Sequence, residues 1–365
     1  MNIPATDFTR RRDRLKAEAS ARGLEGVLVF SWRRRAVTWL TGYSPGFISN
    51  YAALWLPVEG EPLLGIRFGS DGPRAERVSG LRTVGGVDPI AVLPVNARRV
   101  GVITGDFAVD ERPPSLEAEF GRRRVATSNL MAVLDSWRAR KTGEDILRLT
   151  KATHLGAVAL VAGGAVAPVG ETDFAVAARV EAVARAGGAE RALCLVGIGN
   201  AAVTEASGTV IGEADQVSVE LTLYLGGVCA QVIRTILPAH PSRNQKTAIA
   251  ICQSVRHEIV RALQPGRSAS EVVAAGELVL EKWGLWDAVE YDFGHGIGAD
   301  TPEYPRLIHR GEDVIESEMV TAVHVGIRKH DGMTAFLGGP VLIREGGSRE
   351  LIDKPEWAAP HERTA

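Results

Sequence analysis

A carboxylate and a carboxamide lie eleven residues apart in a segment that is typical of a β-hairpin. Residues 217–225 alternate strictly between apolar and polar side chains, and Gly226-Gly227 supplies a two-residue turn. Pairing Leu225 with Val228 places Glu220 and Gln231 as diagonal neighbours on one face, roughly 7–8 Å apart at Cα. That face also carries Tyr224. We therefore expect Glu220 and Gln231 to contact one small ligand.

Two histidines occur later in the chain, each in a distinctive setting. His295 stands inside the glycine-rich segment 294–298, which reads GHGIG. A phosphate-binding loop requires a helix directly after its glycines, whereas prolines follow this segment at 302 and 305. His324 alternates with valines, a pattern that predicts a buried strand and is also typical of a core histidine.

These features together resemble the pita-bread family of aminopeptidase P, prolidase, methionine aminopeptidase and creatinase. The resemblance rests on the hairpin, the Arg234-Thr235 pair that closes it, the GHGIG segment and the order of the domains. In that family two aspartates, the GHGIG histidine and two glutamates hold two metal ions. Here the other four positions fall on Glu220, Gln231, His324 and Gly338. The resemblance therefore predicts that the metal centre is lost and that no cofactor is bound.

Creatinase keeps this fold without metals, and the resemblance to it suggests roles for the polar residues. Its general base follows a Gly-x-Asn loop by five residues, as Glu205 follows Asn200. A carboxylate can serve as general base when burial raises its pKa. Arg306 falls where creatinase has an arginine that holds the substrate carboxylate. The expected catalytic residues are His295, His324, Glu220 and Glu205, and the expected substrate-binding residues are Arg306, Gln231, Tyr224, Glu303 and Phe47.

This residue set predicts a metal-independent hydrolase. Its expected reaction is cleavage of an amidine, urea, lactam or amide C–N bond in a small carboxylate-bearing substrate, with peptides as the least expected substrates. One alternative is a mononuclear metal enzyme with Glu220, His295 and His324 as ligands. The other is a non-catalytic protein that binds a ligand in the emptied pocket. Whether Glu205 or Glu220 acts as the base stays open.

Composition excludes several classes of partner. A net charge of −2 gives no reason to expect nucleic acid or an acidic membrane as a partner. The most apolar stretch, 155–170, is interrupted by glycines and Pro168 and is shorter than the roughly 20 residues of a membrane span. Three cysteines without metal-ligand spacing indicate reduced thiols and a cytoplasmic location. The resemblance adds the expectation of a homodimer.

The elements that position these residues indicate two domains of α/β (α+β) class, since 365 residues are too many for one small core. The sequence predicts a helix at about 6–21 and strands at 26–30, 51–57 and 100–103. Ser268 and Glu271 form a capping box before a helix that Gly284 would end. We expect an N-terminal creatinase/prolidase-like mixed α/β domain at 1–137, a linker at 138–145 and a C-terminal pita-bread domain at 146–365.

Overall fold

The computed structural model describes residues 5–32, 35–45, 51–86, 89–106, 109–110, 113–164 and 169–352. The chain divides into two compact units, Met1–Arg138 and Ala139–Ala365. The residues predicted as a linker occupy the end of helix α5 (Met131–Ala139), a short connection at 140–142 and the first turn of helix α6 (Gly143–Gly164). None of the described helices is long and apolar enough to cross a membrane.

The first unit is built on a mixed sheet whose described strands follow the order β4-β3-β2-β1-β5-β8. Strand β1 is antiparallel to β2 and parallel to β5. The predicted first helix and the strands at 26–30, 51–57 and 100–103 are confirmed. The elements are α1 (Ala5–Ala21), β1 (Gly26–Trp32), α2 (Arg35–Thr41), β2 (Tyr51–Pro57), β3 (Leu63–Ile66), α3 (Gly72–Ser79), β4 (Arg82–Gly85), β5 (Arg99–Ile103), β6 (Gly105–Asp106), β7 (Val109–Asp110), α4 (Pro114–Arg123), β8 (Ala126–Asn129) and α5 (Met131–Ala139), with 3-10 turns at Gly69–Asp71 and Pro89–Val92.

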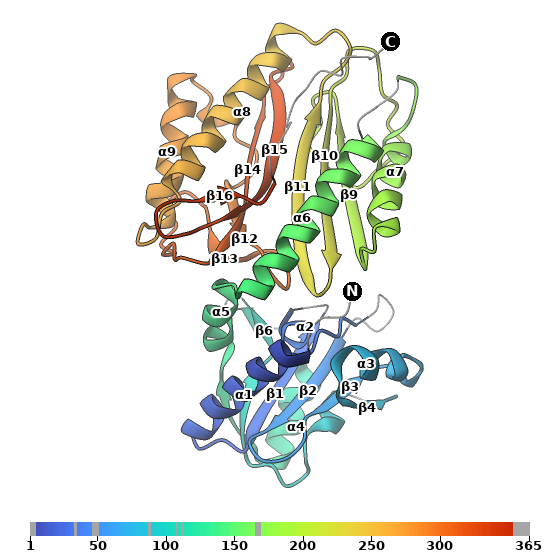
Figure 1. The fold of residues 1–365 in the computed structure, drawn as a ribbon, viewed down its shortest axis with the longest axis vertical. Helices are drawn as coiled ribbons and strands as arrows, with labels where there is room; N and C mark the ends of the chain where they lie inside the picture. Colours follow the sequence, from blue (N-terminus) through green and yellow to red (C-terminus); the bar gives the residue numbers. More distant parts are fainter. Residues whose placement is uncertain are drawn as a thin grey trace. The chain divides into compact units, whose positions relative to one another are not determined.

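The second unit contains an antiparallel sheet with the path β13-β12-β14-β15-β11-β10-β9, and β16 pairs with β15. Figure 1 shows α6 lying across β10 and β11, and α8 across β14 and β15. The elements are α6 (Gly143–Gly164), α7 (Asp173–Ala186), β9 (Arg191–Ile198), β10 (Val217–Leu225), β11 (Val228–Ile236), α8 (Arg243–Ala262), α9 (Ala269–Lys282), β12 (Gly294–Gly296), β13 (Glu303–Arg306), β14 (Val320–Arg328), β15 (Thr334–Leu342) and β16 (Arg349–Glu350), with a 3-10 turn at Trp286–Ala288.

Strand alternation separates a helix-covered face of this sheet from a second face. Val219, Leu221 and Leu223 of β10 belong to the apolar cluster that also contains residues of α6 and α7. Val323 and Val325 of β14 belong to the cluster that contains residues of α8 and α9. Because neighbouring residues of a strand point to opposite faces, Glu220 and His324 lie on the other face of the sheet.

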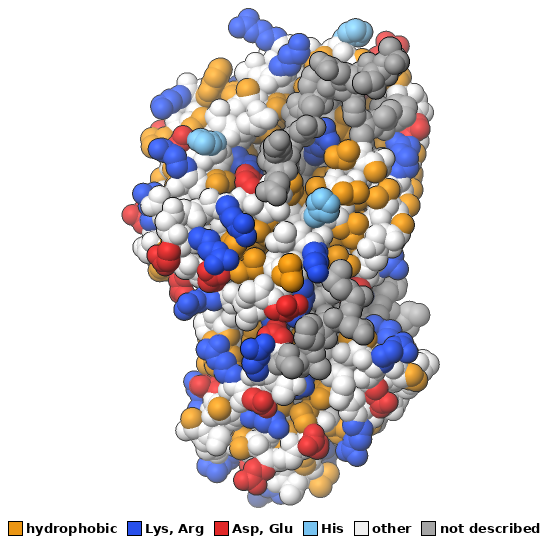
Figure 2. Space-filling view, in the orientation of Figure 1, with side chains coloured by type: hydrophobic (Ala, Val, Ile, Leu, Met, Phe, Trp, Pro, Cys, Tyr) orange, Lys and Arg blue, Asp and Glu red, His pale blue; other side chains and the backbone are white. Residues whose placement is uncertain are grey.

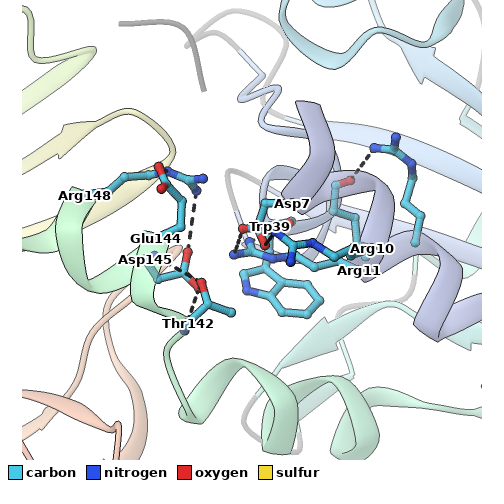
Figure 3. Close-up of polar contacts among 10 residues, drawn as sticks. Asp7, Arg10, Arg11, Trp39, Thr142, Glu144, Asp145 and Arg148 are labelled. Atoms are coloured by element: carbon cyan, nitrogen blue, oxygen red, sulfur yellow. Dashed lines mark hydrogen bonds and ion pairs between the residues drawn. The ribbon is translucent and has the colours of Figure 1, made fainter. Parts of the chain in front are cut away.

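The helices begin where side chains satisfy their first amide groups. The predicted capping box of α9 is confirmed, because the Ser268 hydroxyl accepts from the Glu271 N–H and the Glu271 carboxylate accepts from the Ser268 N–H. At the start of α6 the side chains of Thr142 and Asp145 accept from each other's backbone N–H, and Arg148 lies 3.6 Å from Asp145 (Figure 3). These caps fix where each helix enters the fold.

The first unit carries its own buried polar contacts. Arg11 pairs with Asp7 at 2.6 Å and donates to the backbone oxygen of Trp39, whose ring lies under the guanidinium (Figure 3).

On the surface, basic and acidic side chains are interspersed across the view in Figure 2. This mixed distribution agrees with the net charge near zero.

Candidate active site

The β10–β11 hairpin brings Glu220 and Gln231 together as predicted. Leu225 pairs with Val228, Thr222 stands opposite Gln231 and Glu220 stands opposite Ile233. Both turn glycines, 226 and 227, have positive φ, which suits the tight turn that sets this register. The Gln231 Nε2 donates to Glu220 Oε1 at 2.7 Å, so the diagonal contact is a direct hydrogen bond.

Strands β12 and β14 bring the two histidines to the same face. His295 stands opposite Ala322, two residues from His324 on β14, so both side chains point to one side. Their ring centroids lie 5.5 Å apart at an interplanar angle of 64°. The two histidines therefore lie side by side, and both side chains are buried, His324 at 5% relative exposure and His295 at 9%.

Strands β15 and β11 meet at a short seam that joins the β13-β12-β14-β15 half of the sheet to the β11-β10-β9 half. Strands β11 and β15 share one paired position, Ile233 with Gly338, and Gly338 in turn stands opposite His324. A Cβ atom on residue 338 would lie 2.9 Å from Ile233 Cδ1, so this glycine allows close contact. The Thr235 hydroxyl adds two hydrogen bonds across the seam, one to the oxygen and one from the N–H of Phe336, each 2.9 Å.

Burial makes both imidazoles neutral near pH 7. The pKa of His324 is lowered to about 3, chiefly by burial and also by the neighbouring His295 and Arg256, while the hydrogen bond to the Asp292 backbone carbonyl opposes the shift. Burial also lowers the pKa of His295, against the effect of the Gly296 carbonyl. Each neutral ring therefore offers one N–H and one acceptor nitrogen.

The nearby carboxylates differ in environment. Burial raises the pKa of Glu220, and its hydrogen bond from Gln231 only partly opposes that rise. Asp292 lies 3.4 Å from His324 Nε2 and 3.2 Å from the guanidinium of Arg306. Sequence reasoning did not assign Asp292 a role, although its place three residues before His295 was a usable signal. Asp292 links the buried histidine to the half-exposed arginine.

Two residues predicted for the site are bonded to other side chains, and a third has no polar contact with the site residues in the described part of the chain. Tyr224 donates to Asp300 at 2.6 Å. Glu303 is buried and pairs at 2.7 Å with Lys141, a partner that the sequence did not indicate. Glu205 is exposed, and within the described ranges it has no hydrogen bond or ion pair with either histidine or with Glu220. Phe47 lies outside the described residues.

The comparisons with known proteins place this geometry in a family. Residues 147–347, more than half of the chain, match the metallopeptidase family M24. The Xaa-Pro dipeptidase of Pyrococcus furiosus is 26% identical over 224 residues, which are 60% of this chain and 64% of that protein. The sequence match therefore spans less than two thirds of that relative's length.

Solved structures match over nearly the whole chain. The prolidase from Pyrococcus horikoshii OT3 gives a TM-score of 0.81 at 19% identity and covers 95% of this chain and 99% of its own. The X-Pro aminopeptidase from Thermotoga maritima MSB8 gives 0.86 at 18% identity, with 96% and 99% covered. The predicted fold, a mixed α/β N-terminal domain followed by a pita-bread domain, is confirmed.

The predicted reaction is wrong. A metal-independent hydrolase of C–N bonds other than peptide bonds conflicts with a match to a metallopeptidase family and with relatives named as Xaa-Pro dipeptidases. The prediction followed from the roles of creatinase residues, whereas these relatives are named as Xaa-Pro dipeptidases.

The side chains themselves do not fit a two-metal centre. Gln231 offers an amide in place of a carboxylate and is already bonded to Glu220, and Gly338 offers no side chain. No group of three or more His, Cys, Asp or Glu side chains converges as a metal site in the part of the chain that the structure describes.

The fold, the placement of His295 in the GHGIG segment and the sequence match agree on one classification. The chain belongs to metallopeptidase family M24.

Proposed function

We propose that this chain hydrolyses the peptide bond of short peptides at the sheet face that carries His295, His324 and Glu220. Relatives named as Xaa-Pro dipeptidases support peptides as the substrate class. The observation that carries the proposal is the pair of buried imidazoles, 5.5 Å apart, on the face that also holds a carboxyl group.

The two histidines suit different tasks. The His295 Nδ1 donates to the Gly296 oxygen at 3.2 Å, which leaves Nε2 as the acceptor nitrogen. His295 would take the proton of the attacking water at Nε2. His324, with a pKa of about 3, is a weak base, so it would orient the substrate by hydrogen bonding.

Glu220 and Arg306 complete the proposed roles. A carboxyl group whose pKa is raised by burial holds its proton longer, which suits donation to the leaving amine. The Arg306 guanidinium is half-exposed beside Asp292, and its N–H groups would bind the substrate carboxylate. A small carboxylate-bearing peptide is therefore the proposed substrate.

We propose further that residues 146–365 form the catalytic unit and residues 1–137 the N-terminal domain, and that the protein is a cytoplasmic homodimer. Sedimentation velocity of the purified chain tests the dimer, because a single species at the monomer mass would contradict it.

The activity test uses tag-free protein and a panel of Xaa-Pro and Xaa-Ala dipeptides. Each dipeptide is incubated with protein that has been dialysed against chelator, first without added metal and then with Mn²⁺, Co²⁺ or Zn²⁺. Released amino acids are measured by mass spectrometry. We expect peptide cleavage that falls about 10²–10⁴-fold in His295→Ala. His257→Ala, on the exposed side of α8, is the matched control and should keep full activity. Absence of cleavage under every metal condition would overturn the proposal.

A further inference from the structure

Two buried acceptor atoms on the proposed site face have no hydrogen-bond partner among the described residues. They are Oε1 of Gln231 and Nδ1 of His324. Gln231 is 8% exposed and His324 is 5% exposed, so bulk water does not readily satisfy them. Buried polar atoms in native proteins normally have a partner, and an exception calls for an explanation such as a ligand.

The strand register places these two acceptors on one continuous face. Gln231 and Ile233 are two residues apart on β11 and therefore point the same way. Across the seam, a Cβ at Gly338 would lie within 3 Å of both Ile233 Cδ1 and His324 Cβ. The row therefore runs from Gln231 through Ile233 to His324 without a side chain between the last two.

One neighbouring group adds a further acceptor. The His295 Nδ1 contacts the Gly296 oxygen, which leaves Nε2 of His295 as an acceptor beside His324. The His324 Nε2 faces the Asp292 carboxylate, so its proton belongs there and Nδ1 is the lone-pair nitrogen. A ligand that satisfies this row must supply donors.

We infer that this face binds its ligand through N–H groups of an amine or amide, held directly by Gln231 Oε1 and His324 Nδ1. Donor groups of the ligand would thus lie beside the positions that correspond to metal ligands in the family. The inference rests on the proposed function only for the choice of peptides as probes.

Four probes separate the two sources of N–H. Proline has no amide N–H, so alanyl-proline carries N–H only on its ammonium group. Propionyl-proline has the same shape without that group. Alanyl-alanine and propionyl-alanine form the second pair, and both carry an amide N–H. Isothermal titration with each probe measures affinity, and mass spectrometry afterwards shows whether the probe was cleaved.

Amine recognition predicts that alanyl-proline binds at least about tenfold more tightly than propionyl-proline. Amide recognition predicts instead that both alanine-terminated probes bind and both proline-terminated probes do not. Either result supports the inference. Equal affinities for all four probes, or no binding of any, would overturn it. Binding of two Mn²⁺ ions per chain, lost in Gln231→Leu, would also overturn it.

Variants tie the donor recognition to the named acceptor. Gln231→Leu keeps the side-chain volume and should weaken the preferred probe about tenfold or more. The matched control is Gln216→Leu, another buried glutamine, whose Nε2 donates to the Thr334 oxygen. It should leave affinity unchanged. If Gln231→Leu does not fold, the affinities of the four probes for the wild-type chain still decide whether the ligand is bound through its N–H groups. Binding without cleavage would contradict the proposed function and leave the inference standing.

Discussion

Gly338 lies directly opposite His324 across β14 and β15, and a Cβ atom at residue 338 would stand 2.5 Å from the His324 Cβ. Real Cβ atoms do not approach this closely, so a side chain at 338 would require β14 and β15 to move apart at this position. Glycine at 338 therefore allows the close pairing of these two strands. A glutamate at 338, the ligand that metal-binding members of the family have at this position, would need the same separation of the strands.

Gly338→Ala is expected to destabilise the second unit by about 1–3 kcal/mol, because the added methyl forces the β14–β15 pair apart. Urea denaturation measures the free energy of unfolding. Gly143→Ala, at the start of α6 with open space around its Cβ, is the control and should lie within about 0.5 kcal/mol of wild type. Equal stability of the two variants would refute the packing argument.

Thr235→Val is expected to cost about 1–3 kcal/mol, since it keeps the shape but leaves the Phe336 N–H and the Ser218 hydroxyl without their partner. Thermal and urea unfolding check this value. Thr150→Val, which removes a hydroxyl from α6, is the control and should change stability by about 0.5 kcal/mol or less. A neutral result for Thr235→Val would show that the seam does not depend on this hydroxyl.

Lys141→Met is expected to destabilise by about 3–5 kcal/mol, because the buried Glu303 carboxylate loses its cation. Combining it with Glu303→Leu should recover much of the loss, since no buried charge then remains. Arg140→Ala, which removes an exposed pair with Glu316, should cost about 1 kcal/mol or less. If the double variant is no more stable than Lys141→Met, charge burial is not the cause.

Stability should fall as the pH is lowered from 6.5 toward 4. The unfolded chain protonates His324 near pH 6.5, whereas burial holds the folded pKa at about 3. Stability is therefore complete above pH 6.5 and is lost below it, by about 1.4 kcal/mol per pH unit for one such group. His324→Gln should reduce this slope in urea denaturation from pH 7 to 4, whereas His330→Gln, at an exposed position, should retain it. An unchanged slope in His324→Gln would contradict the assignment.

The sequence allowed good prediction of what depends on local pattern. The alternation of residues 217–225 and the two turn glycines set the hairpin register, and this put Glu220 beside Gln231. The GHGIG segment and the valine strand gave His295 and His324. Contacts between distant segments were not predictable, because no periodicity links Lys141 to Glu303 across 162 positions. The role of general base was transferred to Glu205 from the resemblance to creatinase, but Glu205 is exposed.

The narrow seam at Ile233 and Gly338 makes the proposed site an interface between two consecutive stretches of the chain. Glu220 and Gln231 come from the stretch before α8, and His295 and His324 come from the stretch after it. A ligand that bridges these groups would stabilise the seam against local opening. Hydrogen exchange should then slow most at the Ile233 and Phe336 amides when the ligand binds. Exchange at these two amides therefore measures ligand binding even when no substrate is cleaved.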